Sequence, residues 1–135
     1  MMSNLMEITQ TALAEENLHT YKYAADPENV IRLNVYGSQV AIGVDGEREF
    51  VRIQCVLSLG LTDEAKLQQA YQMVNQWNME NQTKYYMDSD GDLVLEWNMD
   101  ADGGLFGKTI LMAGLARVSA GLREAKAPIM KLCYC

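Results

Sequence analysis

The sequence predicts an α+β protein in which helices pack on an antiparallel β-sheet of about five strands. Three observations predict this class. Apolar residues recur at helical spacing in three segments, and between these segments they alternate with polar residues as in strands. Turn sequences such as Asp45-Gly46 separate neighbouring strand segments, which favours hairpins. The expected order of elements is α-β-β-β-α-β-β-α.

The first half is expected to contain one helix and three or four antiparallel strands. Residues 3–18 show the apolar spacing of a helix. Residues 30–36 alternate between apolar and polar side chains, and residues 39–44 keep this strand character up to the short hairpin signal at Asp45-Gly46. A longer strand follows over residues 48–60.

The second half is expected to contain a helix, a hairpin and a final helix. Residues 62–80 place their apolar side chains on one helical face, and residues 83–99 form the hairpin. The last helix begins near Gly104 and ends at about Lys126, because Pro128 lacks the backbone N–H that a helix interior needs.

The composition is typical of one folded domain. The chain has 135 residues, of which 49% are hydrophobic, and this is enough for a core. We predict a single domain over residues 1–127 and a C-terminal tail over residues 128–135. No run of about 18 apolar residues occurs, so no membrane-spanning helix is expected. The first residues lack the basic and apolar regions of a signal peptide, which predicts a cytoplasmic location.

Charge and cysteine content argue against two classes of function. The chain has 11 basic and 18 acidic residues and a net charge of −7, whereas nucleic-acid binding needs clustered basic side chains. The three cysteines are expected to be reduced, with Cys55 in the core and Cys133 and Cys135 at a frayed end. The single histidine, His19, leaves the terminal cysteines without the further ligands that zinc requires.

Two acidic clusters resemble calcium loops. An EF-hand loop needs oxygen ligands at positions 1, 3 and 5, glycine at position 6 and a bidentate glutamate at position 12. The first cluster, residues 88–92, has its glycine at position 4 and fails. The second has Gly103 at position 6 but Thr109 at position 12, and it follows a strand rather than a helix. Its weak candidate ligands are Asn98, Asp100 and Asp102. Turns are therefore the favoured interpretation, with a calcium-responsive sensor as an alternative.

The first cluster is better explained as the loop of the second hairpin. A three-residue loop at 89–91, with Gly91 in the left-handed conformation, places Lys84 opposite Glu96 as a favourable cross-strand pair. A two-residue loop would shift the register by one and put Asp88 among the apolar side chains. The side chains that the three-residue loop gathers on one apolar face are Tyr85, Met87, Leu93, Leu95 and Trp97.

The sequence contains no catalytic or cofactor motif that we recognise. With one histidine, schemes that pair a nucleophile with a base are limited. The Gly-rich stretch at 103–107 opens a helix but lacks the Lys-Ser/Thr of a phosphate loop. We therefore expect no cofactor and no enzymatic activity, and a small-ligand-binding protein stays open as an alternative.

The last helix carries two candidate packing faces. Gly107, Gly114 and Gly121 are seven residues apart and share one face, where glycine permits close backbone approach. A separate apolar ridge is formed by Leu111, Leu115, Val118 and Leu122. Either both faces pack within the monomer, or one of them packs on a second copy of the chain. We predict a homodimer, with residues 105–122 as the first choice for its surface.

Residues 74–104, VNQWNMENQTKYYMDSDGDLVLEWNMDADGG, resemble the YbjN-like family of bacterial sensory transduction regulators. The resemblance lies in the order of features. A helix ending in an Asn-rich stretch is followed by a Tyr-rich strand, an acidic Asp-Gly turn, an apolar strand and a Gly-Gly entry to the last helix. It implies a fold like that of type III secretion chaperones, which dimerise and hold extended segments of partner proteins. It implies no catalytic residue, and it implies a regulatory or chaperone-like protein-binding role.

Overall fold

The computed structural model describes residues 4–35, 37–102 and 106–134, which form three helices and six strands. The helices are α1 (Asn4–Glu15), α2 (Glu64–Glu80) and α3 (Lys108–Tyr134). The strands are β1 (Thr20–Tyr21), β2 (Val30–Val35), β3 (Ser38–Asp45), β4 (Phe50–Leu57), β5 (Lys84–Met87) and β6 (Leu93–Asp100). One antiparallel sheet joins them in the order β1-β2-β3-β4-β6-β5. The α+β class is confirmed, and the short β1, paired with β2, adds a strand to the expected five.

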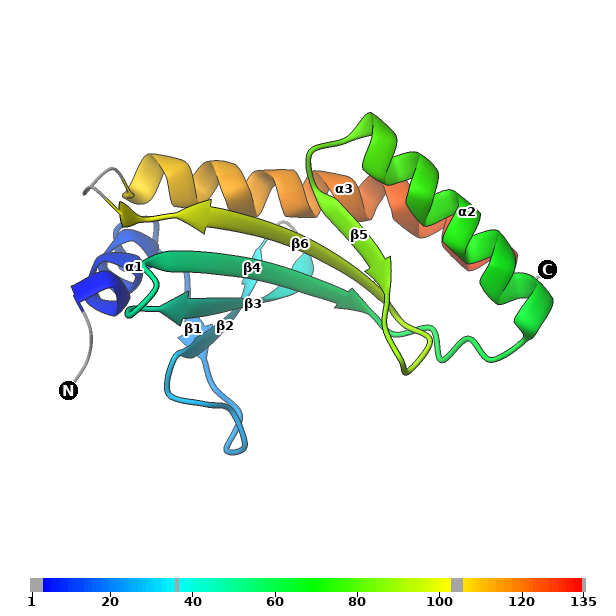
Figure 1. Cartoon of the computed structure of the whole chain (residues 1–135). Coiled ribbons are helices and arrows are strands. Elements are labelled where there is room, and N and C mark those ends of the chain that lie inside the picture. The colour runs from blue at the N-terminus through cyan, green and yellow to red at the C-terminus, as the bar shows by residue number, and fades with distance from the viewer. Residues whose placement is uncertain (1–3, 36, 103–105, 135) are drawn as a thin grey trace.

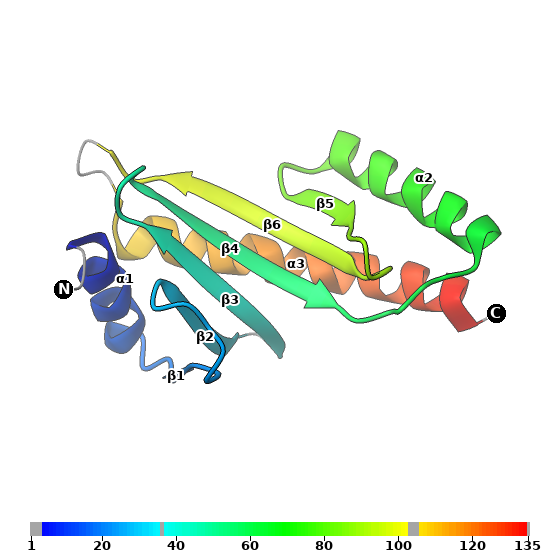
Figure 2. The ribbon, with the colours of Figure 1, turned by 60° about the horizontal axis from the view of Figure 1, so that its bottom comes forward.

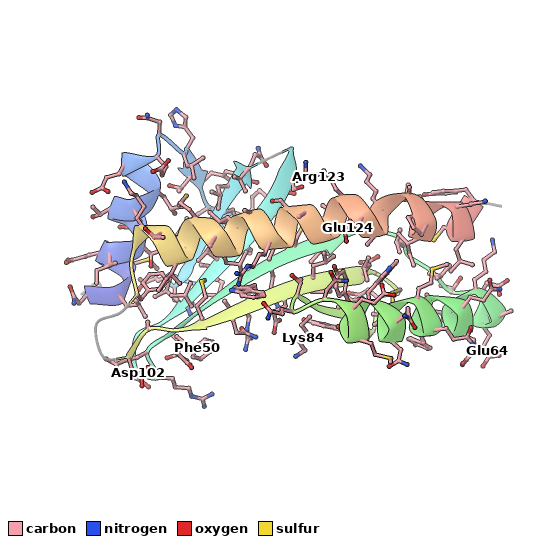
Figure 3. The ribbon with its side chains drawn as sticks, turned by 90° about the horizontal axis from the view of Figure 1, so that it is seen from above. Phe50, Glu64, Lys84, Asp102, Arg123 and Glu124 are labelled. Carbon is pink, nitrogen blue, oxygen red and sulfur yellow. The ribbon has the colours of Figure 1, made fainter. Side chains whose placement is uncertain are left out.

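All three helices lie on one side of the sheet (Figure 1). Helix α3 packs along β4 and β6, α1 contacts α3 and β3, and α2 contacts β5 and α3. Viewed from above, α3 crosses in front of the sheet with α2 beside it (Figure 3). Figure 2 shows the reverse, with β4 and β6 in front of α3. The other side of the sheet therefore carries no helix among the described residues.

The core lies between the sheet and α3. Every second side chain of a strand points to the helices, so Ile42, Ile53 and Leu95 are fully buried there. Leu111 and Leu115 of α3 meet this layer and are also fully buried. Burying each such side chain contributes about 1.5–3 kcal/mol relative to exposing it. This layer is therefore the main source of hydrophobic stabilisation. None of the described helices combines the length and apolarity needed to cross a membrane.

The second hairpin has the predicted register. Lys84 pairs with Glu96 across β5 and β6, and the pairing continues to Met87 opposite Leu93. Gly91 takes the expected left-handed conformation, with φ of +76°. A Cβ at this position would overlap the backbone of Leu61, so the packing of the loop and the backbone angle both select glycine.

The first hairpin is confirmed, but its loop is longer than a two-residue turn. Asp45 pairs with Phe50, so residues 46–49 form the loop. The Asp45 carboxylate accepts hydrogen bonds from the backbone N–H groups of Glu47 and Arg48 at 3.1 and 2.9 Å. Aspartate commonly stabilises turns in this way, and here it favours a wider loop than the Asp-Gly signal predicts.

The predicted end of the last helix is wrong. Helix α3 runs through Pro128 to Tyr134, so residues 128–134 continue the helix instead of forming a tail. A proline inside a helix costs about 3 kcal/mol. Ile129 is fully buried, and the Lys66 ammonium group donates to the carbonyl of Cys133 at 3.2 Å. We attribute the longer helix to this packing and this contact with its last turn. Gly104, the expected start, lies outside the described residues.

Candidate interaction surface

The sheet has an open face, which we define as its side opposite the helices. Strand alternation sets its members: those of β1, β2 and β3 are Tyr21, Val30, Arg32, Asn34, Gln39, Ala41, Gly43 and Asp45. Those of β4, β5 and β6 are Phe50, Arg52, Gln54, Val56, Lys84, Tyr86, Val94, Glu96, Asn98 and Asp100. Val56 is 51% exposed, so the face presents apolar as well as polar groups to solvent.

A buried carboxylate lies on this face. The side chain of Glu96 is only 4% exposed although no described helix covers it. Gln54 donates to its Oε1 at 2.7 Å, the Tyr86 hydroxyl donates to the same oxygen at 3.2 Å, and Asn98 donates to Oε2 at 3.0 Å. The Arg52 and Lys84 cations each approach Oε2 at 3.7 Å. Side chains on three strands thus form one network around a single charge.

The network keeps Glu96 ionised. Burial opposes the negative charge, but hydrogen bonds from Asn98 and Gln54 and the charges of Arg52 and Lys84 outweigh it, so the pKa of Glu96 lies below its ordinary value. Burial and the neighbouring carboxylate raise the pKa of the Tyr86 hydroxyl. Both carboxylate oxygens already accept hydrogen bonds, so we interpret the network as a rigid structural feature rather than a reactive centre.

The two described cysteines lie in the core and near the end of α3. Cys55 faces the helices and is buried, as expected, and burial raises the pKa of its thiol to about 11. A thiol with this pKa is almost entirely protonated at neutral pH and is a poor nucleophile. Cys133 is half-buried near the end of α3. Cys135 lies outside the described residues.

The first acidic cluster forms the predicted hairpin loop. Carboxylate oxygens of Asp88, Asp90 and Asp92 lie within 4.8 Å of one another. One oxygen of Asp88 accepts from the backbone N–H groups of Asp90 and Asp92, and one oxygen of Asp92 accepts from those of Leu59 and Gly60. Asp88 therefore stabilises the hairpin turn, and Asp92 joins this turn to the loop that precedes α2.

The weak calcium candidates lie on and beyond the end of β6. Asn98 and Asp100 are strand residues, and Asp102 follows the strand. The Asn98 oxygen accepts a hydrogen bond from Arg52 Nε at 3.0 Å, so a cationic group already occupies it. Gly103, which completes the loop pattern, lies outside the described residues.

The small-residue stripe and the apolar ridge both face the interior of the same chain. Leu111, Leu115 and Val118 are fully buried. A Cβ on Gly114 would come within 2.9 Å of Ile53, and one on Gly121 would come within 2.7 Å of the Tyr85 hydroxyl. Gly107 precedes α3, and a Cβ there would meet no atom within 4 Å, so this glycine is outside the packed stripe. The expectation of a free second face on this helix is therefore corrected, because the sheet occupies it.

Sequence reasoning placed Glu96 opposite Lys84 but missed its burial. Gln54 and Glu96 are 42 residues apart, and they meet only because β4 pairs with β6. A single sequence offers one weak signal for this contact, an acidic residue inside an otherwise apolar strand.

Comparison with known proteins gives a family and a fold. Residues 9–110 match the family model of YbjN, described as "Putative bacterial sensory transduction regulator". No curated protein sequence matches the chain. YbjN from E. coli has a similar structure, with a TM-score of 0.69 and 12% identity, over 90% of this chain and 91% of that chain.

Two solved complexes contain chains with the same fold. One is the heterodimeric ExoU–SpcU complex from the type III secretion system of Pseudomonas aeruginosa, with a TM-score of 0.57 and 18% identity over 92% of this chain and 96% of that chain. The other is the ExsC–ExsE complex, with a TM-score of 0.57 and 17% identity over 99% and 98%. The resemblance to this fold that the sequence predicts is thereby confirmed.

Proposed function

The chain belongs to the YbjN family, and from this premise we propose that it is a non-enzymatic module that binds another protein in a bacterial regulatory process. The observation that supports this most directly is the fold. Two of the structures that share it are complexes between different proteins. We place the module in the cytoplasm, and fractionation of cells is the test of that location.

The open face is our choice for the partner surface. No helix within the described part of the chain covers it, and the Glu96 network cross-links its middle. A surface that does not have to be ordered on binding loses less conformational entropy when a partner docks. Val56 supplies exposed apolar area beside this network, and Arg52 and Lys84 supply charge at its margin.

A capture experiment with two matched variants tests this proposal. Val56→Lys places a charge on the open face, and Tyr71→Lys does the same on α2, where Tyr71 is 47% exposed against 51% for Val56. We expect immobilised wild-type protein to retain a specific protein from a bacterial lysate, and Val56→Lys to reduce its recovery at least tenfold. Tyr71→Lys should leave recovery unchanged. Equal recovery with both variants would move the surface elsewhere, and no retained protein would contradict the function.

Two further expectations have their own measurements. Calcium titration by calorimetry should give no binding heat at micromolar concentrations, because the loop aspartates bond to backbone N–H groups. Micromolar binding would favour the calcium-sensor alternative.

The homodimer stays a prediction, and light scattering distinguishes it from a single chain of 15.2 kDa. Since the buried side of α3 is packed on its own sheet, such a dimer needs a surface other than Leu111, Gly114, Leu115 and Val118.

A further inference from the structure

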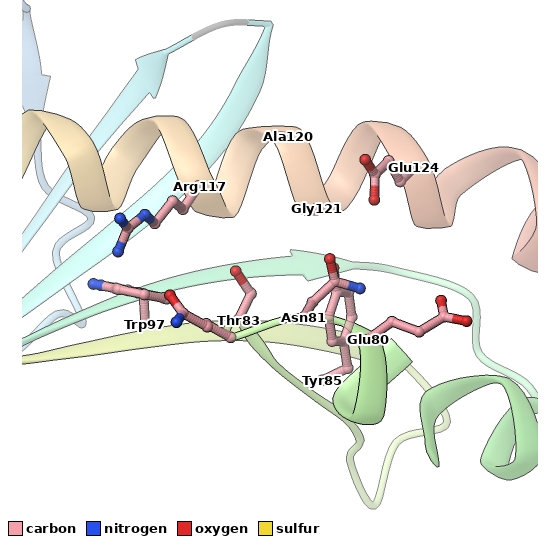
Figure 4. Close-up of a pocket in the computed structure, with 10 residues that line it drawn as sticks. Glu80, Asn81, Thr83, Tyr85, Trp97, Arg117, Ala120, Gly121 and Glu124 are labelled. Atoms are coloured by element: carbon pink, nitrogen blue, oxygen red, sulfur yellow. The ribbon is translucent and has the colours of Figure 1, made fainter. Parts of the chain in front are cut away.

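A groove lies between α3 and the segment that joins α2 to β5, with a volume of about 260 Å³. Figure 4 shows the Arg117 side chain extending from α3 toward Trp97, with Glu124 further along the same helix. The α3 wall consists of Arg117, Ala120, Gly121 and Glu124. The opposite wall consists of Glu80, Asn81, Gln82, Thr83, Tyr85 and Trp97.

The groove carries opposite charges at its two ends. Arg117 and Glu124 are seven residues apart on one helix, which corresponds to two turns and about 10 Å along the axis. The Arg117 guanidinium lies over the ring of Trp97, 4.6 Å from its centroid, so the cation is held in place. Glu80, from the end of α2, lies toward the Glu124 end in Figure 4 and adds a second carboxylate there. Only the small residues Ala120 and Gly121 separate the charges on the α3 wall.

Two unpaired hydroxyl groups line the middle of the groove. Tyr85 is 2% exposed and Thr83 is 6% exposed, yet neither hydroxyl has a hydrogen-bond partner among the residues that the structure describes. Among the described residues, the one polar side-chain atom that is fully enclosed and has no hydrogen-bond partner is Ser119 Oγ. The hydroxyls of Tyr85 and Thr83 are therefore not sealed, and both residues line the groove. Because they are open to the groove, both hydroxyls can form hydrogen bonds with a molecule that enters it.

The position of the Tyr85 hydroxyl is fixed by its surroundings. The Asn78 amide forms two hydrogen bonds with the Tyr85 backbone, at 2.8 and 2.9 Å, and so holds β5 against α2. A Cβ on Gly121 would stand 2.7 Å from the Tyr85 hydroxyl, so glycine at this position gives the ring room to reach α3. The hydroxyl thus lies between the two charged ends of the α3 wall.

We propose that this groove binds a short free peptide of about three residues, with its terminal carboxylate on Arg117 and its terminal ammonium group at Glu124 and Glu80. An extended chain advances about 3.3 Å per residue, so three residues match the rise of about 10 Å along α3 between the positions of Arg117 and Glu124. Peptide carbonyl oxygens accept hydrogen bonds, which suits the hydroxyls of Tyr85 and Thr83. The planar guanidinium of Arg117 suits a carboxylate. A simple anion or cation would match only one end. This site is separate from the open face and does not depend on the proposed function.

Calorimetry with tri-L-alanine tests the site, with acetylated and amidated tri-alanine as the uncharged control peptide. We expect one-to-one binding of tri-alanine with a Kd below about 1 mM and no binding of the blocked peptide. Arg117→Gln should weaken binding at least tenfold, and Tyr85→Phe should weaken it about fivefold through the loss of one hydrogen bond. Arg123→Gln is the matched control, because Arg123 is exposed on the same helix outside the groove. It should leave the affinity unchanged.

Several outcomes would overturn the proposal. The first is an absence of tri-alanine binding at about 10 mM, which is about ten times the expected Kd. The others are equal binding of the blocked peptide and equal weakening of binding by Arg117→Gln and Arg123→Gln. Binding of the blocked peptide would instead indicate an internal segment of a protein. Circular dichroism of each variant checks that the fold is retained, and Tyr85→Phe keeps the ring that fills the space beside Gly121. Loss of partner capture by Val56→Lys is independent of all these results.

Discussion

Leu95 and Glu96 are neighbours on β6 and are both almost completely buried, but by different means. Leu95 faces α3, where a helix covers the sheet and Gly121 brings that helix close. Glu96 faces the open side, where side chains from neighbouring strands surround its carboxylate. One face is therefore buried by a second layer of structure, and the other is buried locally by polar side chains lying across the strands.

The two faces should respond to different kinds of change. The covered face is close-packed, so it is sensitive to added volume. The open face has solvent above it, so added volume is tolerated but the loss of a charged hydrogen-bonding partner is not. Four predictions test this difference, beginning with the largest effect.

Gly114→Leu should destabilise the fold by about 3 kcal/mol, because even a Cβ there would stand 2.9 Å from Ile53 and 3.1 Å from Trp97 and Met99. Urea unfolding measures the change in the free energy of unfolding. Ala116→Leu on the exposed side of α3 is the control and should have little effect. A Gly114→Leu protein as stable as the wild type would show that α3 does not pack on the sheet as described.

Glu96→Ala should cost about 2 kcal/mol, because it removes a charged acceptor that holds Gln54, Tyr86 and Asn98. Asp100→Ala is the matched control, since Asp100 is an exposed acidic residue on the same strand and the same face. Urea unfolding of both variants should give a clear loss for the first and almost none for the second. Equal losses would mean that the open-face network contributes no more than general charge.

Acid should weaken the open face selectively. The pKa of Glu96 is below its ordinary value of 4.5 in the fold, so its ionised form stabilises the protein above pH 4.5 and this contribution is lost as pH falls through the lower folded value. Hydrogen bonds from Arg32 lower the pKa of Asp26 from 3.8 to about 2, so its contribution is lost between these values. Unfolding between pH 7 and pH 2 should show less acid sensitivity for Glu96→Gln than for the wild type. An identical pH dependence would contradict this assignment.

Lys84→Ala should have the smallest effect, about 0.5 kcal/mol, although its ammonium group lies 3.7 Å from Glu96. The Lys84 side chain is 61% exposed, so solvent and salt screen the pair. The difference from wild type in urea unfolding should vanish in about 1 M salt, where the Debye length is about 3 Å. A loss comparable to that of Glu96→Ala would mean that the ion pair, and not the neutral donors, stabilises the carboxylate.

Local patterns were sufficient for much of the fold. The register of β5 and β6 follows from a three-residue loop and from one apolar face, both of which lie within residues 84–97. The three helices and strands β2 to β6 likewise follow from hydrophobic period, because a single element's burial sets the spacing of its own apolar residues. The acidic turn was interpreted correctly for the same reason, since Asp88 bonds to backbone groups only two and four residues away.

Tertiary structure decided what depends on distant neighbours. The end of α3 could not be read from Pro128, because the contacts of Ile129 and of the Cys133 carbonyl with the rest of the chain outweigh a local helix breaker. The glycine stripe did not reveal that Trp97 and Tyr85 would lie against it. The network of Glu96 and the groove at Tyr85 likewise join residues far apart in the chain. A single sequence fixes the period of each element, whereas the pairing of elements determines which polar groups meet and which remain without a partner.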